Sequence, residues 1–323
     1  MTDFDEIETK LKDISDLDLD EKDMVKQLEK QINRRIRNIC LKTIGVLLFL
    51  AGFLYLVINP IMNYGYLNPQ KLENNDKGFT KYLRAYFETM RPYAEVVSTE
   101  IDKQGFGKYT VNLDMQNHIG KTMIGLPNVT MEIDKGKASV ITDAKTMTTA
   151  LIGRFESNWI KKDEFLKDLE ELPDSSVIYL SIGVNTPIPL SELRKEDIQL
   201  DWIEFYNDVS QYQGGLSLNL CALYEDTDER KKLSDKELKE IFLQNLDLLM
   251  TQPVLFQSLG IYSGSLQFFT LDEIKKTRES IDSQEELTIK NYCFSGKKQE
   301  VIEYLQKTDI YSIHVDDIQL TIW

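Results

Sequence analysis

Between Lys42 and Lys71 the chain carries no charged side chain, and residues 43–58 are almost entirely apolar. An α-helix rises about 1.5 Å per residue, so it needs about 20 apolar residues to cross roughly 30 Å of hydrocarbon. Residues 39–58 supply that length. A helix buried in a globular core keeps a polar edge, whereas this segment is apolar on every face. The sequence therefore predicts one transmembrane helix, which we place at residues 37–60.

The charges that flank this segment predict its orientation. Arg34, Arg35, Arg37 and Lys42 precede or enter it, and no acidic residue lies between positions 31 and 72. The positive-inside rule then places residues 1–36 in the cytoplasm and the C-terminal part outside the cell. A cleaved signal peptide is a second explanation for an early apolar run. This run follows a long acidic tail, however, and no small-residue cleavage site comes after it, so we expect a single-pass anchor in the cell membrane.

The N-terminal tail, residues 1–36, has the pattern of an amphipathic helix. Phe4, Ile7, Leu11 and Ile14 recur at spacings of three and four, which places them on one apolar stripe. Ser15 and Asp16 interrupt the pattern, and Asp20 is a candidate cap of a second helix, so a hinge is expected over residues 15–19. The tail thus reads as two helical pieces.

Such short helices are marginal in water alone, because nucleation is costly and the stripe has no core to enter. Two coverings stay open: a second tail in a coiled coil, or the groove of a cytoplasmic partner that binds the helix by its apolar face. The groove is favoured, because so acidic a tail would repel its own copy. The candidate partner-binding residues are Phe4, Ile7, Leu11, Ile14 and Leu17.

The region beyond the span is long enough for one large domain or two modest ones. Amphipathic periodicity and alternation predict an α+β fold with mainly antiparallel strands, divided into units at 61–158 and 159–323, after a turn-rich neck at Asn59-Pro60 and Asn68-Pro69. Helices are expected at residues 78–90, 162–172, 189–194, 234–249, 271–280 and 297–306, and strands within 93–142 and at 177–184, 198–205 and 310–323.

The sequence indicates no catalytic chemistry. His118 and His314 are the two histidines, and neither accompanies a nucleophile motif or a cysteine at zinc spacing. The sequence does not decide whether Cys221 and Cys293 form a disulfide. The net charge of −15 argues against nucleic acid as a partner. We therefore expect no enzyme, no catalytic residue, no metal and no cofactor, although a pair of carboxylates of the glycosidase type stays open.

Several short motifs resemble a known family, the membrane-bound sigma factor regulators of low-GC Gram-positive bacteria. The span with the two Asn-Pro segments is similar to their N-terminal module. Residues 160–323 resemble their C-terminal module, and its motifs here are Val177-Ile-Tyr-Leu-Ser181, Pro189-Leu-Ser-Glu-Leu193, Leu200-Asp-Trp202 and Ile313-His-Val-Asp-Asp-Ile318.

This resemblance implies an anti-sigma factor. Its cytoplasmic tail would hold an alternative sigma factor of the extracytoplasmic-function type at the membrane, and its outer domain would sense the state of the cell envelope. Many anti-sigma proteins carry a zinc-binding His and Cys cluster in the tail, which residues 1–36 lack. The alternative is a membrane-anchored extracellular binding module or wall-active enzyme without cytoplasmic output. Another membrane protein also stays open as a partner.

Overall fold

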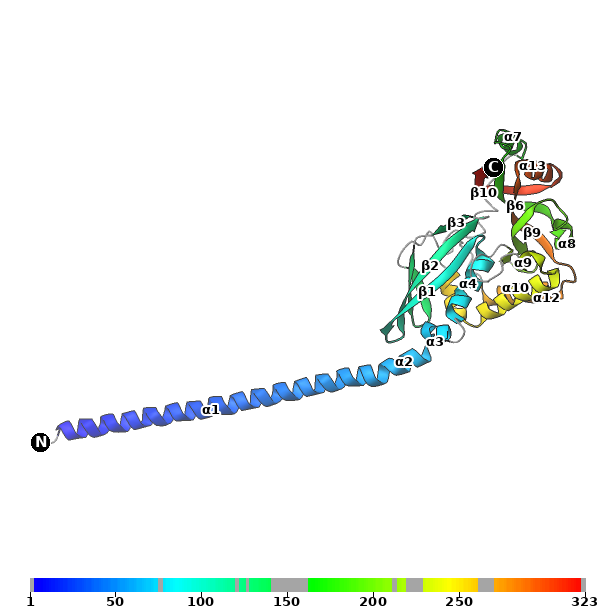
Figure 1. Ribbon diagram of the computed structural model, residues 1–323. Coiled ribbons are helices and arrows are strands. Elements are labelled where there is room, and N and C mark those ends of the chain that lie inside the picture. Colours follow the sequence, from blue (N-terminus) through cyan, green and yellow to red (C-terminus); the bar gives the residue numbers. More distant parts are fainter. Residues whose placement is uncertain are drawn as a thin grey trace. The chain divides into compact units, whose positions relative to one another are not determined.

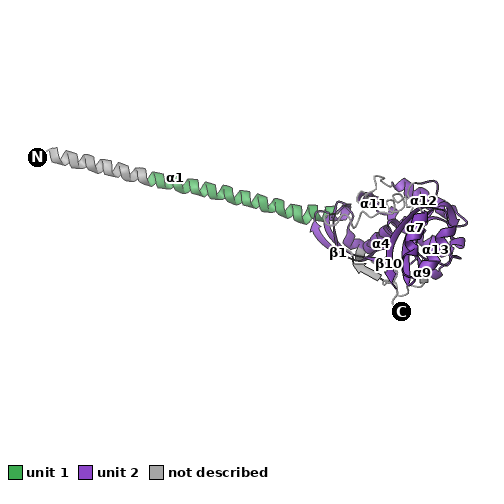
Figure 2. Cartoon of the chain, turned by 90° about the horizontal axis from the view of Figure 1, so that it is seen from above, with its two compact units in different colours: residues 1–62 green, residues 63–323 purple. Residues whose placement is uncertain are grey.

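The computed structural model describes residues 3–74, 78–119, 122–125, 128–140, 162–210, 214–218, 229–260 and 270–320 (Figure 1). The chain forms two compact units, Met1–Met62 and Asn63–Trp323, which Figure 2 colours green and purple. The first unit is helical, and the second contains two antiparallel sheets with helices. The α+β class and the antiparallel strands predicted from the sequence are confirmed.

The expected hinge at residues 15–19 is wrong. One helix, α1, runs without a break over Asp3–Phe53. Residues 15–19 contain neither Gly nor Pro, and Ser or Asp inside a helix costs less than about 1 kcal/mol per residue relative to Ala. Polar residues in this pattern therefore do not stop the helix.

The predicted turn at Asn59-Pro60 is also wrong, because the helix continues through it. A π-helical turn, η1 (Leu54–Ile58), follows α1, and α2 (Asn59–Gly65) follows η1. The N–H of Asn59 donates to the Leu54 carbonyl, five residues back. Pro60 then lies in the first turn of α2, where its missing N–H and fixed φ are tolerated. The predicted turn at Asn68-Pro69 is confirmed, since residues 66–68 are not helical and Pro69 begins α3 (Pro69–Asn74).

The first sheet follows helix α4, whose bounds Gly78–Met90 match the prediction. Its strands are β1 (Ala94–Gly105), β2 (Lys108–Ile119), β3 (Thr122–Gly125), β4 (Val129–Asp134) and β5 (Lys137–Val140). The order is β1-β2-β4-β5, and β3 pairs with one end of β2. The apolar face of α4 and the inward side chains of these strands are buried together.

Helix α4 also closes the outer edge of β1. Arg84 donates from Nε and Nη2 to the carbonyls of Val96 and Val97, at 2.8 and 2.7 Å. Gln70 of α3 donates to the carbonyl of Ile101 at 3.1 Å. These side chains satisfy backbone acceptors that would otherwise offer a pairing edge to another strand.

The second sheet has the order β10-β6-β9-β7-β8, and every adjacent pair is antiparallel. Its strands are β6 (Ser176–Pro189), β7 (Gln199–Phe205), β8 (Gly215–Ser217), β9 (Thr288–Lys297) and β10 (Ile310–Leu320). The sequence predicted β6, β7 and β10 but missed the short edge strand β8 and also β9, which lies in the middle of the sheet. The predicted domain boundary at residue 158 lies outside the described residues.

The helices of this region are α7 (Lys162–Glu170), α8 (Leu190–Leu193), α9 (Glu229–Lys232), α10 (Asp235–Met250), α11 (Pro253–Gly260), α12 (Leu271–Ser283) and α13 (Lys298–Lys307). The predicted capping box is confirmed, since Ser234 and Glu237 exchange side-chain and backbone hydrogen bonds at the start of α10. Both sheets contribute to one cluster of buried apolar side chains.

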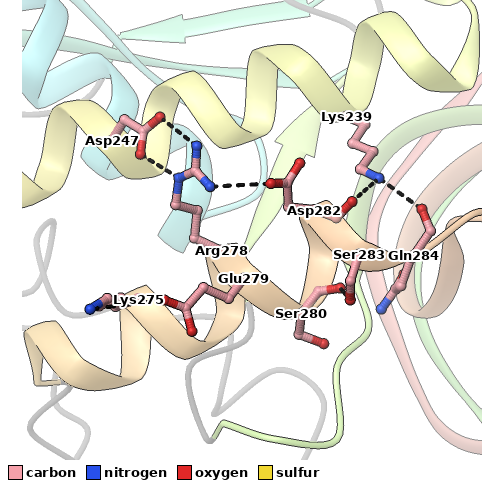
Figure 3. A network of polar contacts seen from close by, with 9 residues as sticks. All are labelled: Lys239, Asp247, Lys275, Arg278, Glu279, Ser280, Asp282, Ser283 and Gln284. Atoms are coloured by element: carbon pink, nitrogen blue, oxygen red, sulfur yellow. Dashed lines mark hydrogen bonds and ion pairs between the residues drawn. The ribbon is translucent and has the colours of Figure 1, made fainter.

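One ion pair and two hydrogen bonds to backbone carbonyls join α10 to α12 and its C-terminal end (Figure 3). The Arg278 guanidinium contacts both carboxylate oxygens of Asp247, at 2.5 and 3.2 Å, and Lys239 donates to the carbonyls of Asp282 and Gln284, at 2.6 and 2.7 Å. These contacts fix the two helices side by side.

Candidate functional site

The N-terminal helix carries all the candidate site residues predicted from the sequence. Arg34, Arg35, Arg37 and Lys42 lie on α1, and all four are exposed. The helix that continues to Gly65 is long and apolar enough to cross a membrane. The charged residues therefore stand at one end of a candidate membrane span, as the sequence predicted. Insertion and orientation stay predictions.

The five candidate partner-binding residues also lie on α1. The backbone of Phe4, Ile7, Leu11, Ile14 and Leu17 is helical, in the same continuous helix as the candidate span. Their side chains lie outside the described part of the chain. The stripe itself therefore stays a prediction, whereas its direct helical connection to the span is a feature of the structure.

A second apolar stripe, which we call the α1 stripe, lies in the last part of the tail and the first residues of the predicted span. It consists of Val25, Leu28, Ile32, Ile36 and Ile39, and these side chains are between 49% and 63% exposed. Their spacing of three, four, four and three residues keeps them on one face of the helix. Large apolar side chains in such a row indicate a surface that another molecule or lipid covers.

The family-like motifs of the second sheet meet on one face of that sheet. Ser181 of β6 donates to Asp316 of β10 at 2.5 Å, and Tyr93 donates to the same carboxylate oxygen at 3.1 Å. The Sγ of Cys293 in β9 lies 3.0 Å from the Ser181 hydroxyl. Tyr93, Tyr179, Trp202 and Cys293 are buried near one another on this face. Residues of three of the four motifs, Tyr179 and Ser181, Trp202, and Asp316, thus meet in the interior beside Tyr93 and Cys293.

Two buried carboxylates on β7 extend this polar interior. Burial raises the pKa of Asp201 to about 6 and the pKa of Glu204 to about 8. Asn291 donates to Glu204 at 2.6 Å, and Tyr311 donates to the Asn291 carbonyl oxygen at 2.6 Å. Sequence reasoning missed both acids. The available signal was their position inside the apolar run 200–205, where a charged residue must be buried or must interrupt the strand.

Helix α4 is tied to the second sheet by another buried carboxylate, Glu88. It pairs with Arg230 and accepts hydrogen bonds from the Ser217 N–H at 3.3 Å and from Asn245 Nδ2 at 3.2 Å. The indole N–H of Trp202 donates to the Glu88 carbonyl at 3.0 Å. The Asp-Trp motif therefore anchors α4, an element that precedes it by more than a hundred residues.

The folded unit has a surface hollow of about 340 Å³ beside α8 and α13. Val184, Ile188, Leu193 and Tyr304 contribute apolar or aromatic lining. Three carboxylates also line the hollow: Glu192, Glu196, which pairs with Lys307, and Asp309. Lys307 lines the hollow as well, so the charged part of its lining carries both signs.

The remaining candidates from the sequence have no arrangement that indicates catalysis. His314 Nε2 lies 3.9 Å from Asp316, and the Asp316 side chain is fully buried. The side chain of His118, like the whole of Cys221, falls outside the described residues. Within the described ranges, no group of three or more His, Cys, Asp or Glu side chains is placed to hold a metal ion.

The fold and the helix together define a class of protein: an α+β unit that follows one N-terminal helix able to cross a membrane. Comparisons with models of known protein families, with curated protein sequences and with solved structures return no match.

Proposed function

We propose that the chain is a membrane-anchored anti-sigma factor. Its tail, residues 1–36, holds an alternative sigma factor in the cytoplasm, and its folded unit lies outside the cell and senses the envelope. The contact is a helix bound in a groove through Phe4, Ile7, Leu11, Ile14 and Leu17. Binding would cover the surface that the sigma factor needs for RNA polymerase.

The observation that carries this proposal is the unbroken helix α1. It joins the predicted stripe of the tail directly to the basic residues and to the apolar segment. An apolar stripe on a short amphipathic helix needs a surface to cover it, and the positive-inside rule assigns the tail to the cytoplasm. The resemblance of the outer motifs to the sigma factor regulators supports the identity of the partner.

We expect Leu11→Asp to abolish capture of the sigma factor. A charge in the middle of the stripe would have to be desolvated in the groove, which costs several kcal/mol. The measurement is co-purification with the tagged full-length protein from detergent-solubilised membranes, followed by mass spectrometry. Thr9→Asp is the matched control, since it adds the same charge two residues away on the other face of the helix.

Capture by the wild type and by Thr9→Asp, with loss in Leu11→Asp, supports the proposal. Equal capture by all three proteins contradicts the stripe, and capture of no sigma factor contradicts the function. Capture of no sigma factor would favour the alternative, a membrane-anchored extracellular binding module. The hollow lined by Glu192, Glu196 and Asp309 is the feature that speaks for that alternative.

A further inference from the structure

We propose that α1 pairs in parallel with α1 of a second copy of this chain, through the α1 stripe of Val25, Leu28, Ile32, Ile36 and Ile39. The proposal rests on the membrane anchoring proposed above and is independent of the sigma factor. It gives the exposed stripe an occupant along residues 25–39, on the same face of α1 as the predicted stripe of the tail. The acids that disfavour pairing of the tail lie before this stretch, apart from Glu29.

The spacing of the stripe suits a helix as the occupant. Val25 and Ile36 are eleven residues and three helical turns apart. The period of the stripe is therefore about 3.67 residues per turn, close to the value of about 3.6 for an ideal helix. The stripe therefore runs nearly parallel to the helix axis. A straight row of Val, Leu and Ile side chains along the axis matches the same row on a parallel neighbour.

The position of the stripe indicates which helix covers it. It begins well before Arg34 and continues past Arg37, since Ile36 stands between Arg35 and Arg37 and Ile39 follows them. A globular partner in water would cover the first part, and lipid would cover the last. A helix that itself passes from water into the membrane covers both. A second copy has the same apolar residues at the same height.

The charges allow this pairing only when the two helices are parallel. An antiparallel copy would place its apolar span in water. In the parallel pair, Lys30 and Arg34 lie on the face away from the stripe, so the like charges of the two copies stay apart. Glu29 and Arg35 flank the stripe on opposite sides, which brings Glu29 of one copy to the side of Arg35 of the other.

Cysteine cross-linking of the full-length protein in isolated membranes tests the pairing. The background is Cys40→Ser, because Cys40 is an exposed thiol on the same helix. Ile32→Cys and Ile36→Cys place a thiol on the stripe, and Lys30→Cys places one on the opposite face. We expect oxidation to yield at least five times more disulfide-linked dimer from either stripe variant than from Lys30→Cys. Equal yields at all three positions, or no dimer from the stripe positions, would overturn the proposal.

Co-purification of two differently tagged copies gives a second measurement. Ile32→Asp should reduce recovery of the second tag at least fivefold, whereas Asn33→Asp, the same charge one residue away, should not. If both tags are recovered equally from Ile32→Asp, the stripe is not the interface. The sigma factor captured in the same preparations distinguishes the two proposals. If the sigma factor is retained while the dimer is lost, neither the proposed function nor the proposed pairing is contradicted. If the sigma factor is absent while the dimer is intact, only the proposed function is contradicted.

Discussion

At the scale of single residues, the folded unit keeps several acids away from water. Asp201 and Glu204 are buried among apolar residues of β7. Gln199 donates a hydrogen bond to Asp201, and Asn291 of β9 donates one to Glu204. Burial without a full counter-charge favours the protonated form of a carboxyl group. These residues therefore couple the stability of the folded unit to pH.

We expect the free energy of unfolding to fall as pH rises from 5 to 8. The folded pKa values of Asp201 and Glu204 are about 6 and about 8, above their ordinary values. The folded protein therefore holds protons in this range that the unfolded chain releases, and the resulting stability is lost as pH passes each folded pKa. One pKa unit corresponds to about 1.4 kcal/mol, so the total change is several kcal/mol.

Urea unfolding of the folded unit at a series of pH values measures this slope. Glu204→Gln removes one titrating group while its side-chain oxygen still accepts from Asn291, so most of the slope between pH 6 and 8 should disappear. A free energy of unfolding that rises with pH over this range would contradict the expectation, as would a Glu204→Gln variant with an unchanged slope.

At the scale of elements, a close approach between β8 and β7 depends on a glycine. A Cβ atom placed on Gly215 would lie 1.8 Å from Trp202 Cζ2 and 2.4 Å from the Ile203 carbonyl oxygen. Trp202 is fully buried and its indole is held by Glu88, so the ring has no space to retreat. The pairing of these strands leaves no room for a side chain at this position.

Gly215→Ala is therefore expected to lower the free energy of unfolding by about 3 kcal/mol, the upper part of the range for overpacked cores. Gly296→Ala is the matched control, because its nearest contact would be the Val301 Cγ2 at 3.2 Å, a side-chain atom that can move. We expect that variant to lose less than about 1 kcal/mol. Chemical denaturation of both variants measures the difference. Equal stability would mean that the Trp202 ring is free to move.

The elements that the sequence predicted correctly have a clear periodicity. Phe79, Tyr82, Leu83 and Tyr86 mark α4 by their helical spacing, and Ser234 with Glu237 marks the start of α10. Strand β9 was missed because Lys290, Asn291 and Ser295 give it the polarity of a surface strand. Strand β9 is in fact central in its sheet, and one face of that sheet is buried although it is polar. The periodicity of a single sequence does not distinguish a buried polar face from a face exposed to solvent.

The residues of the candidate site also fall into those that the sequence predicted and those that it did not. The basic residues and the apolar segment followed from charge and hydropathy, because those signals are local in the chain. The network of Ser181, Asp316 and Tyr93 did not, because its members come from distant segments and meet only in the folded sheet. The continuity of α1 was missed because Ser15 and Asp16 were given too much weight against weak differences in helix propensity.

At the scale of the whole molecule, the boundary after Met62 separates a helix from a unit with its own core. The second unit begins with Asn63, whose side chain accepts a hydrogen bond from the Gly107 N–H at 2.9 Å. Both sheets, the buried acids Glu88, Asp201 and Glu204, and the ion pair between α10 and α12 belong to this unit. None of these contacts requires residues 1–62.

Residues 63–323 produced alone should therefore be soluble and should unfold in one cooperative transition, because the cluster of buried apolar side chains is retained. Circular dichroism during heating, with gel filtration of the same sample, measures this. Full-length protein in detergent is the control for the folded signal. Aggregation of the shortened chain, or a loss of its cooperative transition, would show that the helix is needed for the fold.

The unbroken helix also determines how far the tail can reach. Leu11 and Ile39 are 28 residues apart on α1, so a distance of about 40 Å separates them along the axis. If the helix stands upright, a protein bound at Leu11 is held on a rigid stalk, clear of the lipid headgroups. A protein bound at that distance would not need to contact the membrane surface. Proteolytic cleavage of the helix anywhere between the bound protein and the membrane would release that protein into the cytoplasm.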